Sequence, residues 1–203
     1  CGMFEHIHFD IDIERKIPVE RLRWPSARQV RDGSGLGGNR DYCDLRGQPW
    51  SDGTDVLREE YELIERIELA ENPVEESELI EEEFTDDPGG MMGLDIGVAS
   101  TVAALSAAGG VPFASCNGGA FGGPHHESHP LVVFGARREH LPLLLAAAEL
   151  TGVGMESGQM GEVMVYADDI RRMPAFAATL LENRDLFDGL GFSDTEAKYS
   201  DRA

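Results

Sequence analysis

The hydrophobic and polar residues of the chain follow two kinds of pattern, and the first is an alternation near the N-terminus. In residues 5–13 (EHIHFDIDI) every second residue is apolar, and the second, fourth, sixth and eighth residues are histidine or aspartate. A period of two predicts a β-strand with one buried face. The buried face would consist of Ile7, Phe9, Ile11 and Ile13. The other face would carry His6, His8, Asp10 and Asp12.

The second half of the chain carries continuous apolar runs, which are typical of fully buried elements. Residues 94–110 (LDIGVASTVAALSAAGG) contain so many small side chains that they predict a closely packed helix, ended by two glycines. A second helix is predicted at residues 139–150, and a last one is capped by Asp168 or Asp169 and ends at about residues 181–186. Short buried strands are predicted at 111–116 (VPFASC), 130–136 (PLVVFGA) and 162–167 (EVMVYA).

This order of elements predicts an α+β fold. A small mixed or antiparallel sheet would carry helices packed on one face. The predicted division is an N-terminal strand region (1–23), a Gly/Asp/Arg-rich loop (24–53), an acidic arm or insertion (54–90), an α+β core (91–190) and a flexible tail (191–203).

The acidic arm changes this picture most. Of the 203 residues, those from 52 to 87 include 16 acidic residues and two arginines, so they supply −14 of the formal net charge of −21. Two short apolar stripes, Tyr61/Ile64/Ile67/Leu69 and Leu79/Ile80/Phe84, lie on either side of Pro73 and indicate helices. The segment is interpreted as a solvated helical hairpin or a partly disordered insertion. Residues 54–87 are also a candidate docking arm for a basic protein partner.

Charge and cysteine content limit the classes of function and the compartment. A net charge of −21 opposes broad contacts with nucleic-acid phosphates and with anionic membranes. The three cysteines at positions 1, 43 and 116 do not form a disulfide framework, so a reducing compartment is expected. The start of the chain does not look like a signal peptide, and the longest nearly apolar run is too short for a membrane span. We therefore expect a soluble, cytoplasmic protein.

Candidate chemistry is concentrated in residues 114–130 (ASCNGGAFGGPHHESHP). Cys116 ends a predicted strand and opens a glycine-rich turn. The backbone N–H groups of the next three residues would face a small ligand, as in anion-binding nests. If the loop folds back, the imidazoles of His125 and His129 would activate the thiol. The alternative is that Cys116 is only a small buried residue of the core. The ligand-binding candidates are Ser115, Asn117, Gly118, Gly119, Ser157 and Gly158.

The histidines of this loop are also candidate metal ligands. His125, His126 and His129 lie beside Glu127, and imidazole with carboxylate suits zinc. Their spacing matches none of the established zinc motifs. If the N-terminal strand lay beside the loop, such a site would be completed by His6, His8, Asp10 or Asp12. The alternatives are a mobile loop and a solvent-exposed strand.

Motifs between Leu94 and Pro174 resemble, in their order, the tRNA wybutosine N4-methyltransferase family. That family has a small-residue helix, a strand ending in Ser-Ser-Cys-Ser-Gly-Arg, a strand–helix pair, and a Glu-Ser-Gly-like turn before another strand. ASCNGG keeps Ser115, Cys116 and Gly118, with Gly119 in place of the arginine, and GMESGQMG keeps the Glu-Ser-Gly turn at 156–158. The resemblance implies binding of S-adenosylmethionine and a proton-steering role for Asp95 or a histidine.

Two classes of function follow from the sequence. The first is a small-ligand-binding or accessory module with its site in the loop 116–129. The second is an enzyme centred on Cys116 and the loop histidines, with Asp95 as a further catalytic candidate. Its reaction would be methyl transfer to a nucleoside from S-adenosylmethionine, or a thiol- or metal-assisted hydrolysis with zinc as the candidate cofactor.

Overall fold

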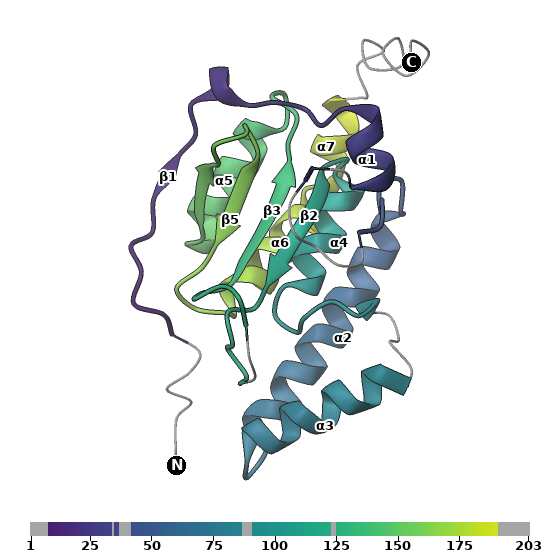
Figure 1. Ribbon diagram of the computed structural model, residues 1–203, viewed down its shortest axis with the longest axis vertical. Coiled ribbons are helices and arrows are strands. Elements are labelled where there is room, and N and C mark those ends of the chain that lie inside the picture. Colours follow the sequence, from purple (N-terminus) through teal and green to yellow (C-terminus); the bar gives the residue numbers. More distant parts are fainter. Residues whose placement is uncertain (1–7, 34, 37–41, 87–90, 123–124, 191–203) are drawn as a thin grey trace.

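The fold is known from a computed structural model, which describes residues 8–33, 35–36, 42–86, 91–122 and 125–190. It is an α+β fold, as the sequence predicts, with a five-stranded mixed sheet in the order β1-β4-β5-β3-β2 (Figure 1). The strands are β1 (Arg15–Lys16), β2 (Val111–Cys116), β3 (Leu131–Gly135), β4 (Gly154–Ser157) and β5 (Val163–Tyr166). The helices are α1 (Ala27–Asp32), α2 (Trp50–Leu69), α3 (Pro73–Asp86), α4 (Ala99–Ala107), α5 (Leu141–Thr151), α6 (Arg172–Glu182) and α7 (Arg184–Leu190).

The sheet is antiparallel except at one edge, where β1 runs parallel to β4. Its register fixes which residues share an end of the sheet. Cys116 pairs with Leu131, which pairs in turn with Tyr166 on β5. Ser157 pairs with Val163 at the opposite end of the strands. Strand β2 is an edge strand, so its last residue, Cys116, lies at a corner of the sheet.

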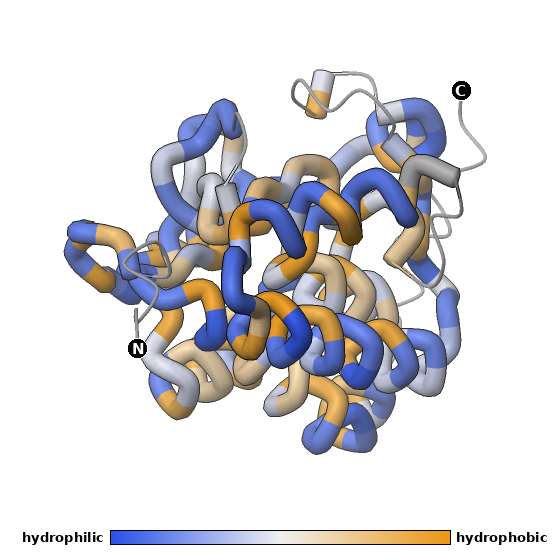
Figure 2. The backbone as a smooth tube through the Cα atoms, turned by 90° about the horizontal axis from the view of Figure 1, so that it is seen from below, coloured by the Kyte–Doolittle hydropathy of each residue, from blue (hydrophilic) through white to orange (hydrophobic). Residues whose placement is uncertain are grey.

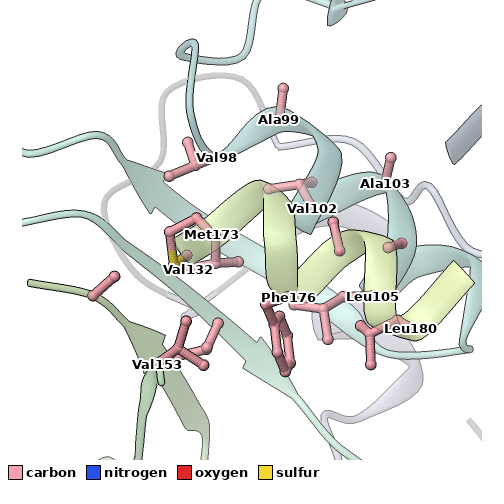
Figure 3. Packing of buried hydrophobic residues seen from close by; sticks show 14 of the residues in the cluster. Val98, Ala99, Val102, Ala103, Leu105, Val132, Val153, Met173, Phe176 and Leu180 are labelled. Carbon is pink, nitrogen blue, oxygen red and sulfur yellow. The ribbon is translucent and has the colours of Figure 1, made fainter. Parts of the chain in front are cut away.

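Helices α4, α5 and α6 cover one face of the sheet, and their shared interior is the main core (Figure 1). Residues Ala99–Ser106 of α4 are all buried, as expected for a helix of small side chains. Figure 3 shows how α4 and α6 meet the sheet, with Met173 of α6 beside Val132 of β3. A smaller apolar cluster joins α1 to β2 through Val30, Leu36, Val111 and Phe113.

The acidic segment forms a helical hairpin, and its first helix belongs to the core. Helix α2 packs against both α4 and α6, and α3 packs against α2. The buried face of α2 differs from the predicted stripe, because Tyr61 and Leu69 are exposed. Its buried positions are Gly53, Val56, Glu60, Ile64 and Ile67. Figure 2 shows hydrophilic and hydrophobic positions alternating along the helical turns.

The two arginines of the hairpin are engaged within it. Arg66 on α2 forms ion pairs with Glu76 (2.5 Å) and Glu83 (3.0 Å) on α3, and Arg58 pairs with Asp55. Most of the other acidic side chains of α2 and α3 are exposed and give the hairpin a strongly negative exterior, and a basic partner for it stays a prediction. None of the helices in the described ranges combines the length and apolarity that a membrane crossing requires.

The predicted N-terminal strand at residues 5–13 is wrong, because the strand that forms lies after this segment. Ladder hydrogen bonds define only Arg15–Lys16 as β1, with an isolated bridge between His8 and Asp169. Between them, burial alternates as the sequence predicts, with Phe9 and its alternate neighbours half-buried. The Tyr166 hydroxyl accepts a hydrogen bond from the Glu14 N–H at 3.0 Å, which ties the segment to the sheet without a continuous ladder. His6 lies outside the described residues.

Further elements differ from the predictions. Helix α6 begins at Arg172 with Arg171 as its N-cap, so neither Asp168 nor Asp169 caps it. The segment 24–53 is not a single loop, because it contains α1 and the first turn of α2. Ser26 caps α1 in a capping box with Gln29. Strand β4 was not predicted, since it has only four residues and was interpreted as a turn. The predicted tail 191–203 lies outside the described residues.

Gly97 fixes the backbone just before α4. It has φ of 95°, and a Cβ atom there would lie 2.4 Å from Cγ1 of Ile170. Gly93 has a similar φ of 71°, but no neighbouring atom lies within 4 Å of the position that its Cβ would take. The two positions therefore separate backbone strain from steric crowding.

We predict that Gly97→Ala is more destabilising than Gly93→Ala. Both substitutions place a side chain at positive φ, which costs roughly 1–2 kcal/mol. Crowding against Ile170 adds about 1–3 kcal/mol at Gly97 alone. Urea unfolding of the two variants measures the difference, and equal losses of unfolding free energy would show that the packing around Gly97 is not as tight as described.

Candidate functional site

The loop after β2 folds back, so that the sulfur of Cys116 and one imidazole lie together. Cys116 Sγ is 3.6 Å from His125 Nδ1. The carboxylate of Asp95, four residues before α4, has its Oδ2 atom 3.9 Å from the same Nδ1. Among the described residues, these three form the single group of histidine, cysteine or carboxylate side chains whose ligand atoms all lie within 4.8 Å of one another. We call this group the Asp95–Cys116–His125 cluster.

The fold brings these residues together from two sources. Cys116 is at the corner of the sheet where β2 ends, and Asp95 is in the turn that leads into α4. Asn117 joins the two, because its N–H donates to Asp95 Oδ2 (3.2 Å) and its side-chain amide donates to the Ile96 carbonyl (3.2 Å). Asn117 is buried, so these bonds are shielded from water.

The orientation of His125 is fixed by its second ring nitrogen. Nε2 lies 2.9 Å from the Gly122 carbonyl oxygen, which can only accept a hydrogen bond. Nε2 therefore carries the proton, and in the neutral imidazole the lone pair is on Nδ1, facing Cys116 and Asp95. Nδ1 can thus accept the thiol proton or bind a metal ion.

Gly118 allows the loop to close. It has φ of 66°, and a Cβ atom would lie 2.4 Å from the carbonyl carbon of His129. Only glycine fits this close approach of two backbone segments. The Gly118 N–H also donates to Cys116 Sγ at 3.4 Å, which helps to fix the position of the sulfur.

The predicted anion-binding nest is wrong. Its N–H groups all donate to other groups of the protein: that of Asn117 to Asp95, that of Gly118 to the Cys116 sulfur, and that of Gly119 to the Asn117 side chain at 3.0 Å. The turn is therefore closed on itself by an Asx-type hydrogen bond. These groups position the cluster and do not face a ligand.

The other loop histidines take different positions. His126 is exposed. His129 packs its ring edge-on against Tyr166, with ring centres 5.7 Å apart, and burial lowers the pKa of His129. His8 Nε2 lies 3.7 Å from Asp169 Oδ2, and the two residues also form an isolated backbone bridge shortly after the end of β5. The prediction that several histidines gather around one metal ion is therefore corrected to a single histidine, His125, with a thiol and a carboxylate.

The remaining ligand-binding candidates do not form one site with Cys116. Ser157 and Gly158 end β4 at the opposite end of the sheet, because β4 pairs with β5 so that Gly154, not Ser157, is level with Tyr166 and Cys116. Ser115 lines an apolar pocket of about 320 Å³ along the edge strand, together with Leu94 and Val102. Ser115 is therefore next to Cys116 in sequence, but it lines a pocket to which none of the three cluster residues contributes.

Glu60 is a feature of this region that the sequence did not reveal. It is fully buried on α2, and its Oε1 atom accepts hydrogen bonds from the N–H groups of Gly97 (2.8 Å) and Ala99 (2.9 Å). Its Oε2 atom accepts from the Ser100 N–H (3.3 Å) and from the Ser100 hydroxyl. In the sequence, the burial of Glu60 is indicated only by its spacing of four residues from Val56 and from Ile64, which places all three on one helix face.

Comparisons of the chain with protein-family models, with curated proteins and with solved structures find no match. The resemblance to the tRNA wybutosine N4-methyltransferase family therefore stays a prediction.

We predict that Glu60 makes stability fall as pH rises toward neutrality. Burial raises the pKa of Glu60 from its ordinary 4.5 to about 7, although hydrogen bonds from Ser100, Gly97 and Ala99 oppose this. Between these two pH values the native state binds more protons than the unfolded state, so its free energy of unfolding decreases with pH. The difference between the pKa values of Glu60 in the unfolded and native states corresponds to a loss of unfolding free energy of the order of 3 kcal/mol. This loss is complete above pH 7.

Urea unfolding of the wild type and of Glu60→Gln between pH 4 and 8 measures this effect. The glutamine cannot ionise, so its difference from the wild type isolates Glu60 from the repulsion among the other acidic residues. A difference that stays constant over this range would mean that Glu60 ionises in the native state as it does in water.

Proposed function

We propose that this protein binds a divalent transition metal, with zinc as the expected ion, through Asp95, Cys116 and His125. The metal would hold a small ligand or act in metal-assisted hydrolysis. The observation that carries the proposal is the convergence of a thiol, an imidazole nitrogen and a carboxylate within 4.8 Å of one another. Nitrogen and sulfur ligands, with carboxylate oxygen, are the set that zinc prefers in proteins.

The distances within the cluster suit a tetrahedral ion. Zinc bonds of about 2.3 Å to sulfur and about 2.0–2.1 Å to nitrogen and oxygen place ligand atoms roughly 3.4–3.6 Å apart at tetrahedral angles. Cys116 Sγ and His125 Nδ1 are 3.6 Å apart, already at this spacing. Nδ1 and Asp95 Oδ2 are 3.9 Å apart, and all three ligand atoms lie within 4.8 Å of one another, so the carboxylate would have to move toward the ion.

Each of the three side chains has a backbone partner that would hold it as a ligand. The Gly122 carbonyl accepts from His125 Nε2, the Gly118 N–H donates to the sulfur, and the Asn117 N–H donates to Asp95. Outer-shell hydrogen bonds of this kind fix the orientation and protonation state of metal ligands. The net charge of −21 adds a general attraction for cations.

Among the residues that the structure describes, the cluster supplies three protein ligands, which leaves a fourth coordination position. Structural zinc sites usually have four protein ligands, whereas catalytic sites have three and an open position for water or substrate. Asp95 is 39% exposed in its side chain, so the cluster is reachable from solvent on that side. This supports ligand binding or hydrolysis over a purely structural metal.

A second candidate is a thiol nucleophile without metal. The lone pair of His125 Nδ1 faces the Cys116 sulfur at 3.6 Å, which is the arrangement of a cysteine–histidine pair. His125 would take the thiol proton, and Asp95 would stabilise the resulting imidazolium. Metal content distinguishes the two candidates, because a metal ion would occupy the same lone pair.

We predict that the wild-type protein binds one equivalent of zinc or cobalt(II). Cys116→Ser and His125→Gln should each weaken binding by more than about 100-fold, because the loss of a ligand costs more than the loss of an outer-shell partner. Isothermal titration calorimetry measures the affinity. The cobalt(II) complex should show a thiolate-to-metal charge-transfer band, which Cys116→Ser abolishes.

Matched controls are available for both ligands. Cys43 is an exposed cysteine and His126 an exposed histidine next to His125, so Cys43→Ser and His126→Gln should bind metal as the wild type does. If the control variants lose affinity as the ligand variants do, the metal binds elsewhere. If the wild type binds no metal, but Cys116 reacts with iodoacetamide faster than Cys43 and only with His125 present, the thiol nucleophile replaces the metal site.

A further inference from the structure

We propose that Glu60 is a positioning residue for the metal site. Glu60 fixes the turn at the start of α4, and this turn holds Asp95 in place. This inference rests on the proposed function. Glu60 belongs to α2, and its hydrogen bonds go to Gly97, Ala99 and Ser100 rather than to a proposed ligand. Its role would be to fix the backbone that carries one of them.

Glu60 and the start of α4 depend on each other for their hydrogen bonds. The carboxylate accepts from the N–H groups of Gly97, Ala99 and Ser100 and from the Ser100 hydroxyl, and it is fully buried. The first N–H groups of a helix have no partner within the helix, and leaving them unpaired in the interior is costly. Any movement of this turn would break several of these bonds together.

The same turn carries the links to the metal ligands. Asp95 lies two residues before Gly97, and its carbonyl oxygen accepts from the Val98 N–H at 3.3 Å, which closes the turn. Ile96 and Asp95 both bond to Asn117, the residue after Cys116. A short chain of hydrogen bonds therefore runs from Glu60 through the turn to two of the three ligands.

The turn is also confined from its other side. A Cβ atom on Gly97 would collide with Ile170, the residue two positions before α6. The backbone at Gly97 is thus held between Glu60 on α2 and Ile170. Loss of the Glu60 carboxylate removes one side of this support, and Asp95 gains freedom to move away from His125.

The test uses Glu60→Gln and Glu60→Leu in the full chain, with cobalt(II) as the probe. Glu60→Leu removes all acceptors, and we expect it to weaken cobalt binding by roughly 10–100-fold, the usual effect of losing outer-shell support. Glu60→Gln keeps one oxygen for Gly97 and Ala99, so it should lose less. In both variants the visible cobalt spectrum should shift toward that of Asp95→Asn, because the carboxylate is the ligand that is displaced.

Thr101→Val is the matched control. Thr101 is a buried polar residue of the same helix, and its hydroxyl donates to the Met173 carbonyl at 2.8 Å, away from the turn. This variant should weaken the packing of α4 on α6 while leaving cobalt affinity and spectrum unchanged. Circular dichroism at the temperature of the titration verifies that each variant is folded.

The outcomes separate this inference from the proposed function. If the wild type binds no cobalt, the metal site and the role of Glu60 both fail. If the wild type binds cobalt but the folded Glu60 variants keep its affinity and spectrum, Glu60 has only a structural role. The same conclusion follows if Thr101→Val loses as much cobalt affinity as the Glu60 variants. If Glu60→Leu does not fold, the spectrum of Glu60→Gln decides: an unshifted spectrum overturns the positioning role.

Discussion

The rest of the structure depends on the hydrogen bonds between Glu60 and the start of α4. A carboxylate without contact to water is tolerated only where enough donors surround it, and here four hydrogen bonds converge on it. The arrangement joins the acidic hairpin to the core, because Glu60 lies on α2 and its donors precede or begin α4. The turn that it fixes is the one that carries Asp95.

The site follows from this constraint and from the corner of the sheet. Cys116 lies where edge strand β2 ends, so the chain can turn there without breaking the ladder. Asn117 then bonds to the turn before α4, and the glycine at 118 lets the returning backbone pass close by. The result is a cluster of a thiol, an imidazole and a carboxylate. Asp95 lies 21 residues before Cys116 in the sequence, and His125 lies nine residues after it. Each has a backbone partner that limits its orientation.

Much of the fold was predictable from the sequence, because continuous apolar runs mark buried strands and helices well. The strands at 111–116 and 131–135, and helix α4 with its small residues, lie within the predicted segments. Strand β4 was missed because four residues carry too little periodicity. The N-terminal alternation predicted the burial of Phe9 correctly, but hydrogen bonding to a sheet edge depends on tertiary geometry that alternation does not report.

The site was predictable only in part. The sequence marked Cys116, His125 and Asp95 as candidates, but it gave no means of choosing His125 over His126 or His129. That choice depends on how the loop closes over Gly118. Glu60 was hidden in a run of acidic residues, where a glutamate usually faces water. Its position in line with Val56 and Ile64 on a buried helix face distinguishes it, but the predicted stripe began at Tyr61, which is exposed.

X-ray absorption at the zinc edge of the zinc-loaded protein tests the central claim most directly, because it reads the ligand atoms themselves. The account predicts one sulfur at about 2.3 Å and the other ligands as nitrogen or oxygen at about 2.0–2.1 Å, with one imidazole among them. A shell without sulfur, or a shell with two, would contradict it, since the described cluster offers a single thiol.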